Sequence, residues 1–391
     1  MPEADIVWWI VASIIFFAVV TLLSPQMMWL QARAGLTQMK KAVVDLDKMA
    51  KESKKIALKA IVKHGKPKQD VEKEFNDFLD FFAIEPVSED PVGVLRRLEH
   101  ILDVRNKRFK DAIARLAPNA DPETAANLEM ALEGAMANYT LYRLVRHFLV
   151  LAEKTKNIQI VMLVQMNIPF LRTYAKAFVD ATKAFVEGKP IGDGVGPLTV
   201  VKLVKEGKFY EPVEDTVYTE SEFEGRKLLI VKAKGPGGRV GKPGELVARL
   251  AKKRKVARII MIDAAGKLEG EASGEVVEGV GAAIGGPPTE KYKIEEIAVE
   301  RKIPIDAIVI KESYTESLKP LNKKLVRGVD EAVERVKNAI RQRTNPGDTV
   351  IVAGIGNTIG IGQSLKDLPT DFPAPPEEKK DEIESTYLPV R

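Results

Sequence analysis

The sequence contains no cysteine and only three histidines. Without cysteine the chain cannot form disulfides, use a thiolate nucleophile, or hold zinc or an iron–sulfur cluster through thiolate ligands. His64, His100 and His147 are too far apart to form a two-ligand pair at i, i+4 spacing, so we expect no histidine-rich metal site and name no metal ligand. Asparagine and glutamine are also scarce, whereas lysine, arginine and glutamate are abundant, a balance that indicates a thermophilic source.

The length and composition are those of a folded protein with more than one domain. The chain has 391 residues, of which 45% are hydrophobic and 29% are charged. This is enough apolar material for a real core and too much for a disordered chain. We therefore expect two or three folded domains.

One long hydrophobic run lies near the N-terminus. No charged residue occurs between Asp5 and Arg33, and Ile6–Leu23 is almost wholly apolar, which is the length at which a membrane-spanning helix is expected. The alternative is a secretory signal peptide, but that would carry positive charge before the run, where this chain has Glu3 and Asp5. The sequence therefore predicts a transmembrane anchor.

The charges that follow this run predict its orientation. Residues 33–68 carry eleven lysines and arginines against three acids, and positive charge marks the cytoplasmic side of a span. We expect a single-pass protein of the cell membrane, with its N-terminus outside and its body in the cytoplasm. The basic segment would also attract anionic lipid headgroups. We expect no nucleic-acid partner, because the basic residues are not interleaved with aromatic ones.

The segments after the anchor are predicted to be helical and to self-associate. Apolar residues at a spacing of three and four over Leu36–Ala60 indicate a seam between helices. The uncharged stretch Asn157–Leu171 is too short for a second span and indicates a helix that is buried or forms an oligomer. We expect a homo-oligomer formed through Leu36–Ala60 or through the helices of residues 122–187.

Beyond a glycine- and proline-rich loop at residues 188–197, strands are predicted to alternate with helices. Four apolar runs rich in β-branched residues predict strands at 227–231, 257–262, 306–310 and 349–353, with helices at 244–255, 290–302 and 326–343. Strands separated by helices form βαβ units, so we predict an α/β domain with a mainly parallel sheet. The predicted order is a transmembrane anchor (1–32), a long basic juxtamembrane helix (33–69), an all-helical assembly domain (70–190), the α/β domain (198–364) and a flexible tail (365–391).

Three glycine-rich stretches follow strands of this domain, at the edge where parallel sheets bind ligands. The first, Lys234–Glu245, is not a P-loop, because Pro236 and Pro243 stand where that motif needs glycine and serine or threonine. The start of its helix, with two basic residues, can still receive an anion; the alternative is a tight turn with solvated basic side chains. The candidate ligand-binding residues here are Gly235, Gly237, Gly238, Arg239, Gly241 and Lys242.

The second and third stretches supply the other candidates. Asp263 follows the apolar run Ile259–Ile262, so its carboxylate is predicted to face a cleft, where it could do acid–base work or bind a metal. The alternative is that Asp263 caps a turn and that the glycines serve close packing. The third stretch is Ala353–Gln363. We therefore name Asp263 as the candidate catalytic residue, and Gly279, Gly281, Gly356, Asn357 and Thr358 as further candidate ligand-binding residues.

Five stretches are distinctive: FFAIEP, DPVGVLRRLEHIL, GPGGRVGKPGE, IDAAGKLEGEASGEVVEGVGAAIGG and GDTVIVAGIGNTIGIG. Together they resemble an uncharacterised archaeal family of membrane-anchored proteins, a domain of unknown function, which implies no activity. Residues 228–286 are also similar, at the level of fold, to the hydrogenase maturation protease and spore germination protease superfamily. There, a carboxylate in the first loop and an aspartate after the second strand form an acidic site. Asp263 matches the aspartate, but Lys242 stands where the other carboxylate is expected.

Two hypotheses of function follow. The first is a membrane-tethered cytoplasmic scaffold or binding protein, which self-associates through its helices and whose α/β domain binds a small anionic ligand or a peptide. The second is a membrane-anchored, peptidase-like hydrolase centred on Asp263. The missing first carboxylate favours the first hypothesis. An Asp263 that is buried and bound only to backbone amides would weigh further against the hydrolase. The sequence does not identify a cofactor.

Overall fold

The computed structural model describes residues 3–83, 93–204, 207–368 and 371–374. Within the first helix, side chains are described at Ser13, at Phe16 and from residue 32 onward. The chain divides into two compact units. Unit 1 comprises Met1–Lys55 and Gly134–Val179, and unit 2 comprises Ile56–Glu133 and Asp180–Arg391.

The first half of the described chain is helical, as predicted. An acid directly before a proline marks the start of helix α4, because Asp121 Oδ1 accepts hydrogen bonds from the N–H groups of Glu123 (3.1 Å) and Thr124 (3.0 Å). A similar pair, Asp90-Pro91, lies outside the described residues. The helices are α1 (Glu3–Gly65), α2 (Glu72–Leu79), α3 (Val94–Leu116), α4 (Pro122–Thr155) and α5 (Ile158–Glu187).

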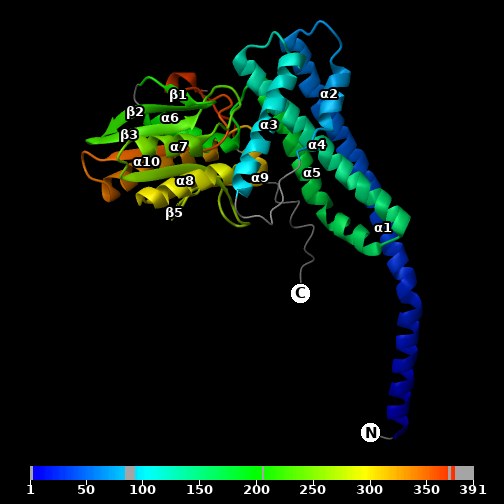
Figure 1. The fold of residues 1–391 in the computed structure, drawn as a ribbon. Helices are drawn as coiled ribbons and strands as arrows, with labels where there is room; N and C mark the ends of the chain where they lie inside the picture. Colours follow the sequence, from blue (N-terminus) through cyan, green and yellow to red (C-terminus); the bar gives the residue numbers. More distant parts are fainter. Residues whose placement is uncertain (1–2, 84–92, 205–206, 369–370, 375–391) are drawn as a thin grey trace. The chain divides into compact units, whose positions relative to one another are not determined.

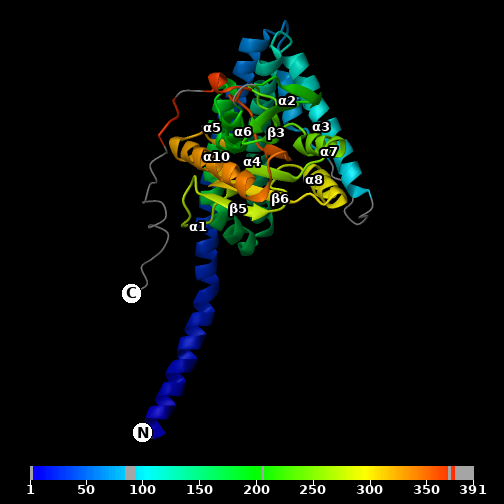
Figure 2. The ribbon, with the colours of Figure 1, turned by 90° about the vertical axis from the view of Figure 1, so that its left-hand side faces the viewer.

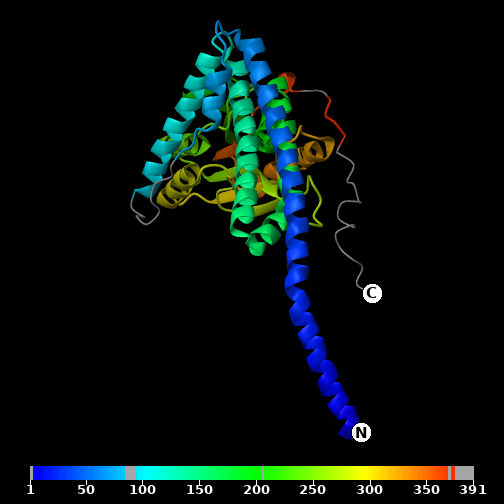
Figure 3. The same ribbon diagram turned by 90° about the vertical axis from the view of Figure 1, so that its right-hand side faces the viewer.

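The transmembrane helix predicted over Ile6–Leu23 has to be corrected. Over the residues that the structure describes, none of the helices contains an apolar stretch that could span a membrane. Residues 6–23 are the first part of α1, a single helix of 63 residues that continues through the charged segment to Gly65 (Figure 3). The apolar run is thus one part of a longer helix rather than a separate element.

In unit 1, helices α1, α4 and α5 pack around one apolar core (Figure 3). Met39, Ala42 and Leu46 of α1 lie in this core with residues of the other two helices. A buried polar contact joins the same three helices, because Asn138 Nδ2 donates to Ser53 Oγ (2.8 Å) and to the carbonyl of Ala175 (3.0 Å). The predicted seam therefore already packs, over residues 36–50, inside the chain's own bundle.

Unit 2 contains a seven-stranded sheet in the order β1-β2-β3-β7-β4-β6-β5. The pairs β3–β7, β7–β4 and β4–β6 are parallel, whereas β1–β2, β2–β3 and β5–β6 are antiparallel. The strands are β1 (Tyr210–Val213), β2 (Thr216–Phe223), β3 (Arg226–Ala233), β4 (Arg258–Gly266), β5 (Val276–Val280), β6 (Ile305–Glu312) and β7 (Thr349–Gly354).

The sheet is mixed, so the prediction of a mainly parallel sheet is wrong. The four predicted strands form its centre as β3, β4, β6 and β7, but β1, β2 and β5 were missed. These strands are polar and partly exposed, and they lack the continuous apolar run of a strand buried on both faces. The β2–β3 hairpin turns at Glu224-Gly225, where φ values of 48° and 76° fit the two-residue turn that matches strand twist.

Helices cover both faces of the sheet (Figures 1 and 2). On one face, α6 (Val195–Leu203) and α10 (Lys323–Arg343) pack in a core that includes Leu198, Ile262 and Val329. On the other, α7 (Pro243–Lys253) and α8 (Pro288–Arg301) pack with Met261 and Ile351. The short helices η1 (Gly192–Gly194), α9 (Tyr314–Leu318) and η2 (Leu365–Asp367) also belong to unit 2, as do α2 and α3.

The predicted flexible tail, residues 365–391, lies partly outside the described residues. Leu368 and Phe372 pack against the core on the α6 and α10 face, and the carbonyl of Pro373 accepts a hydrogen bond of 3.0 Å from the N–H of Lys323. These residues anchor the first part of the tail to the α/β domain. Residues 375–391 lie outside the described residues.

Candidate functional site

Asp263 lies in β4, toward the carboxyl end of the strand. Only 5% of its surface is exposed. Its Oδ1 accepts a hydrogen bond from the N–H of Ala264 and its Oδ2 accepts one from the N–H of Gly285, both at 2.8 Å. These donors are backbone amides, so Asp263 fixes the return loop at Gly285 to the strand. That pattern weighs against the peptidase-like hydrolase.

A second carboxylate comes from η1, which lies in the glycine- and proline-rich loop predicted at residues 188–197. Asp193 Oδ2 accepts a hydrogen bond of 2.8 Å from the N–H of Asn357, the residue predicted to bind a ligand. The segment is held in place by a β-bridge between Ile191 and Pro320. Asn357 thus has a definite role, which is to position Asp193 beside the end of the sheet.

A third carboxylate, Glu312, is the last residue of β6. It is only 2% exposed. In the described part of the chain, neither Oε1 nor Oε2 has a hydrogen-bond partner. Gly192 lies against this group, because a Cβ built there would be 2.5 Å from Glu312 Oε2. An unpaired carboxylate at this depth is costly unless a proton or a cation neutralises it.

The fourth carboxylate, Glu316, belongs to α9 and is fully used in local structure. Its Oε2 accepts hydrogen bonds from the hydroxyl of Ser273 (2.7 Å) and the N–H of Ser313 (2.9 Å). The hydroxyl of Ser313 accepts from the N–H of Glu316 in return, which forms a capping box. Burial alone would raise the pKa of Glu316, but these hydrogen bonds lower it overall.

These four groups, which we call the acidic cluster, influence one another's ionisation. Burial raises the pKa of Asp263 to about 7, and the negative charge of Asp193 contributes to that rise. Burial, followed by repulsion from Asp193, Glu316 and Asp263, raises the pKa of Glu312 well above its usual value. Burial also raises the pKa of Asp193, against the opposing effect of the Asn357 N–H. Positive charge is not among the causes for Asp193, Asp263 or Glu312, so the cluster favours a proton or a cation.

The first glycine-rich loop has a different environment. Arg239 forms ion pairs with Glu123 (2.5 Å) and Asp215 (3.1 Å), and Lys242 forms one with Asp103 (2.7 Å). The N–H of Gly237 also donates to Glu123, at 2.7 Å. Carboxylates of the chain itself therefore occupy the two cations that were predicted to receive an anionic ligand.

The remaining glycines of this loop serve close contacts. The N–H of Gly238 donates to Asn127 Oδ1 at 2.9 Å, and the carbonyl of Gly235 accepts from Gln363 Nε2 at 2.6 Å. Gly241 has a φ of 61°, and a Cβ there would lie 2.5 Å from Thr216 Oγ1. These positions need glycine because other parts of the chain approach the backbone closely.

The third glycine-rich stretch joins the first loop to η1. The hydroxyl of Thr358 is buried within 3.1 Å of the carbonyls of Lys234, Gly237 and Arg239. Gly356, with a φ of 126°, approaches the carbonyl of Asp193 so closely that a Cβ would lie 1.9 Å from that oxygen. Both residues hold the loops in place around the acidic cluster.

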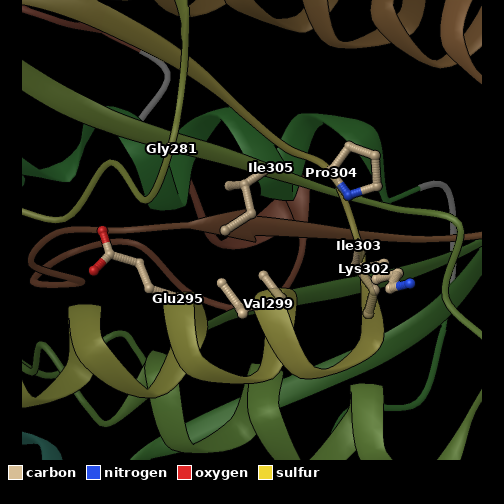
Figure 4. Close-up of a pocket in the computed structure, with 8 residues that line it drawn as sticks. Gly281, Glu295, Val299, Lys302, Ile303, Pro304 and Ile305 are labelled. Carbon is tan, nitrogen blue, oxygen red and sulfur yellow. The ribbon is translucent and has the colours of Figure 1, made fainter.

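Gly279 and Gly281 lie at the opposite end of β6. Gly279 pairs with Ala307 in the sheet, and the N–H of Gly281 donates to the carbonyl of Ile305. Gly281 borders a mainly apolar surface pocket of about 420 Å³ between β6 and α8 (Figure 4). The structure therefore does not bring these two glycines together with Asp263. The pocket is lined by Gly281, Glu295, Ala298, Val299, Lys302, Ile303, Pro304 and Ile305.

The matches to family models cover most of the chain. Residues 9–188 match the model described as protein of unknown function (DUF1512) N-terminal domain, and residues 191–362 match the domain of unknown function (DUF1512) C-terminal. The chain belongs to the DUF1512 family. No curated protein and no solved structure matches it. The expectation of an uncharacterised family is confirmed, whereas an archaeal origin, membrane anchoring and the protease resemblance are not shown.

All four members of the acidic cluster lie in the DUF1512 C-terminal domain. Of these four residues, only Asp263 was predicted from the sequence. Glu312 carried a similar signal, since it ends the strand that follows, but Asp193 carried none because it lies in a loop. The partners of the first glycine-rich loop, Glu123 and Asp103, lie instead in the DUF1512 N-terminal domain.

Proposed function

We propose that the α/β domain of this DUF1512 protein is a cation-binding domain and that its site is the acidic cluster. The observation that carries the proposal is the convergence of Asp193, Asp263 and Glu312, which come from three separate elements and whose surroundings raise the pKa of each carboxyl group. Each group would gain from a positive charge, because burial has removed the water that would otherwise stabilise the ionised form.

The proposed ligand is a cation, whereas the sequence suggested an anionic ligand. That prediction depended on Arg239 and Lys242, and each of these residues has an acidic partner inside the chain. An anion would have to displace Glu123 or Asp103 from them. A cation at the acidic cluster displaces nothing but protons.

Melting temperatures measured with different ions test the proposal. Magnesium, calcium or spermidine should raise the melting temperature, whereas inorganic phosphate at the same ionic strength should not. A ligand at a hundred times its Kd adds about 2.7 kcal/mol of stability. The proposal fails if phosphate stabilises the protein and none of the cations does.

Binding should also depend on pH. Because the pKa of Asp263 is about 7, this carboxyl is mostly protonated at pH 6 and mostly ionised at pH 8. Proton competition at this one group should make cation binding about tenfold weaker at pH 6 than at pH 8. Asp263→Asn should remove the part of that difference that comes from this group and leave the part that comes from Glu312. Glu269→Gln, a change at an exposed acid of the same loop, is the control and should leave the whole difference intact.

We further propose that the protein self-associates through α5. One side of this helix, formed by Val161, Val164 and Ile168, is buried in the unit 1 core. Another side is apolar but exposed, and the spacing of its residues by four places several of them in one stripe. The exposed residues are Met162 (59%), Leu163 (57%), Met166 (70%) and Phe170 (62%).

Met166→Glu should shift the protein from an oligomer toward a monomer. A charge in the middle of a buried apolar interface is costly to desolvate, so dissociation should occur at micromolar concentration in sedimentation velocity. Val299→Glu, at a position of unit 2 that is 79% exposed, should leave the oligomer unchanged. A wild-type protein that sediments as a monomer would contradict this proposal.

A further inference from the structure

The strongest unexplained feature of the fold is the carboxylate of Glu312. Only 2% of its surface is exposed, and in the described part of the chain both of its oxygens lack hydrogen-bond partners. We infer that Glu312 and Asp193 together hold a divalent metal ion of the oxygen-preferring kind, such as magnesium, manganese or calcium. The inference rests on the proposed cation-binding function and names the cation.

The hydrogen bonds within the acidic cluster show which oxygens remain for an ion. Asp263 uses both of its oxygens for backbone N–H groups, and Glu316 is engaged with Ser273 and Ser313. Asp193 uses Oδ2 for one N–H group. Among the described residues, both oxygens of Glu312 are buried acceptors without a donor, and the hydrogen bond from Asn357 to Asp193 goes to Oδ2, so Oδ1 of Asp193 can face an ion. Two carboxylates therefore supply three oxygens.

The close packing around Glu312 favours a small ion over an organic cation. The backbone of Gly192 lies directly against it, since a Cβ there would be 2.3 Å from the carbonyl oxygen of Glu316 and 2.5 Å from Glu312 Oε2. Even a methyl group would collide at this point. The carbonyl oxygen of Glu316 therefore lies close to Glu312. Backbone carbonyl oxygens of this kind commonly serve as ligands in calcium sites.

The donor set indicates which metals fit. Oxygen ligands suit magnesium, manganese and calcium, while softer metals prefer sulfur and nitrogen. No group of three or more acidic, histidine or cysteine side chains among the described residues is arranged to hold a metal ion. An ion held by Glu312 and Asp193 alone would have to take its other ligands from water and backbone carbonyls, as magnesium commonly does.

Titration of the EDTA-treated, full-length protein with manganese tests the inference. Manganese binding is followed at pH 8 by electron paramagnetic resonance, and magnesium and calcium are tested as competitors. We expect one site per chain. Glu312→Gln and Asp193→Asn, which keep the shape of each side chain, should each weaken binding about tenfold or more. Glu269→Gln should bind like the wild type.

The melting temperature of each metal-free variant shows whether lost binding reflects lost folding. If Glu312→Gln fails to fold, Asp193→Asn decides the test. Unchanged manganese affinity in the folded variant would overturn the inference. A wild type that binds none of the three metals, but binds spermidine in a way that depends on Asp263, would overturn it and leave the proposed cation-binding function standing. Binding of neither metals nor spermidine would overturn both.

Discussion

Replacing Gly356 by alanine should lower the free energy of unfolding by about 3 kcal/mol or more. Gly356 has a φ of 126°, a backbone conformation that residues with a Cβ rarely adopt. The added methyl group would lie 1.9 Å from the carbonyl oxygen of Asp193. Relief would require η1 to move away from β7. The variant should therefore unfold at lower urea concentration, and the position of Asp193 should change with it.

Gly279→Ala is the matched control for this substitution. Gly279 has no positive φ, and a Cβ built there would meet no atom within 4 Å. Alanine at an exposed, unstrained position changes the free energy of unfolding by about 0.5 kcal/mol or less. Equal effects of the two substitutions in urea denaturation would contradict the close approach of Gly356 to η1.

The second large effect concerns pH. The metal-free protein should lose up to about 4 kcal/mol of stability between pH 4 and pH 7 through Asp263 alone. The pKa of this carboxyl rises from an unfolded value of 3.8 to about 7 in the folded protein. As pH rises through 3.8 the unfolded chain ionises and gains stability, while the folded protein holds its proton until about pH 7. Above that pH, both states are ionised and the effect is constant.

Asp263→Asn isolates this contribution from those of the other titrating groups. Asparagine keeps one acceptor oxygen, but its amide would face one of the two N–H groups of Ala264 and Gly285, at a cost of about 1–3 kcal/mol. The variant should thus be the less stable protein at pH 4 and lose that disadvantage by pH 8. Urea denaturation in EDTA across this range measures the difference, and a constant difference would show that Asp263 is not electrostatically strained.

Local sequence patterns were sufficient to predict the central elements of the fold. The runs that became β3, β4 and β7 are buried on both faces, and β6 is buried on one face and half-buried on the other, so apolar and β-branched residues were selected at consecutive positions. The start of α4 was likewise predictable, because Asp121 caps a helix within its own few residues. Such features depend on neighbours along the chain and leave their signal in a short stretch of sequence.

The edge strands were not predictable in the same way. Strand β2 is buried mainly in its first half and partly exposed from Glu220 onward, and it carries Thr219, Glu220, Ser221 and Glu222 in succession. Such a strand is stabilised by its backbone bonds to β3 rather than by its own apolar content. The mixed character of the sheet therefore followed from pairings between strands.

The sequence by itself determined the order of helices and strands, the glycine-rich loops and the position of Asp263 near the carboxyl end of a strand. Only the tertiary structure decided which charges meet. It paired Arg239 and Lys242 with acids more than a hundred residues away in the sequence, and it placed Asp193 and Glu312 beside Asp263. The physical reason is that secondary structure depends on local hydrogen bonding and on the spacing of apolar residues, whereas a site of several charges depends on strand order and on how loops pack at the end of the sheet.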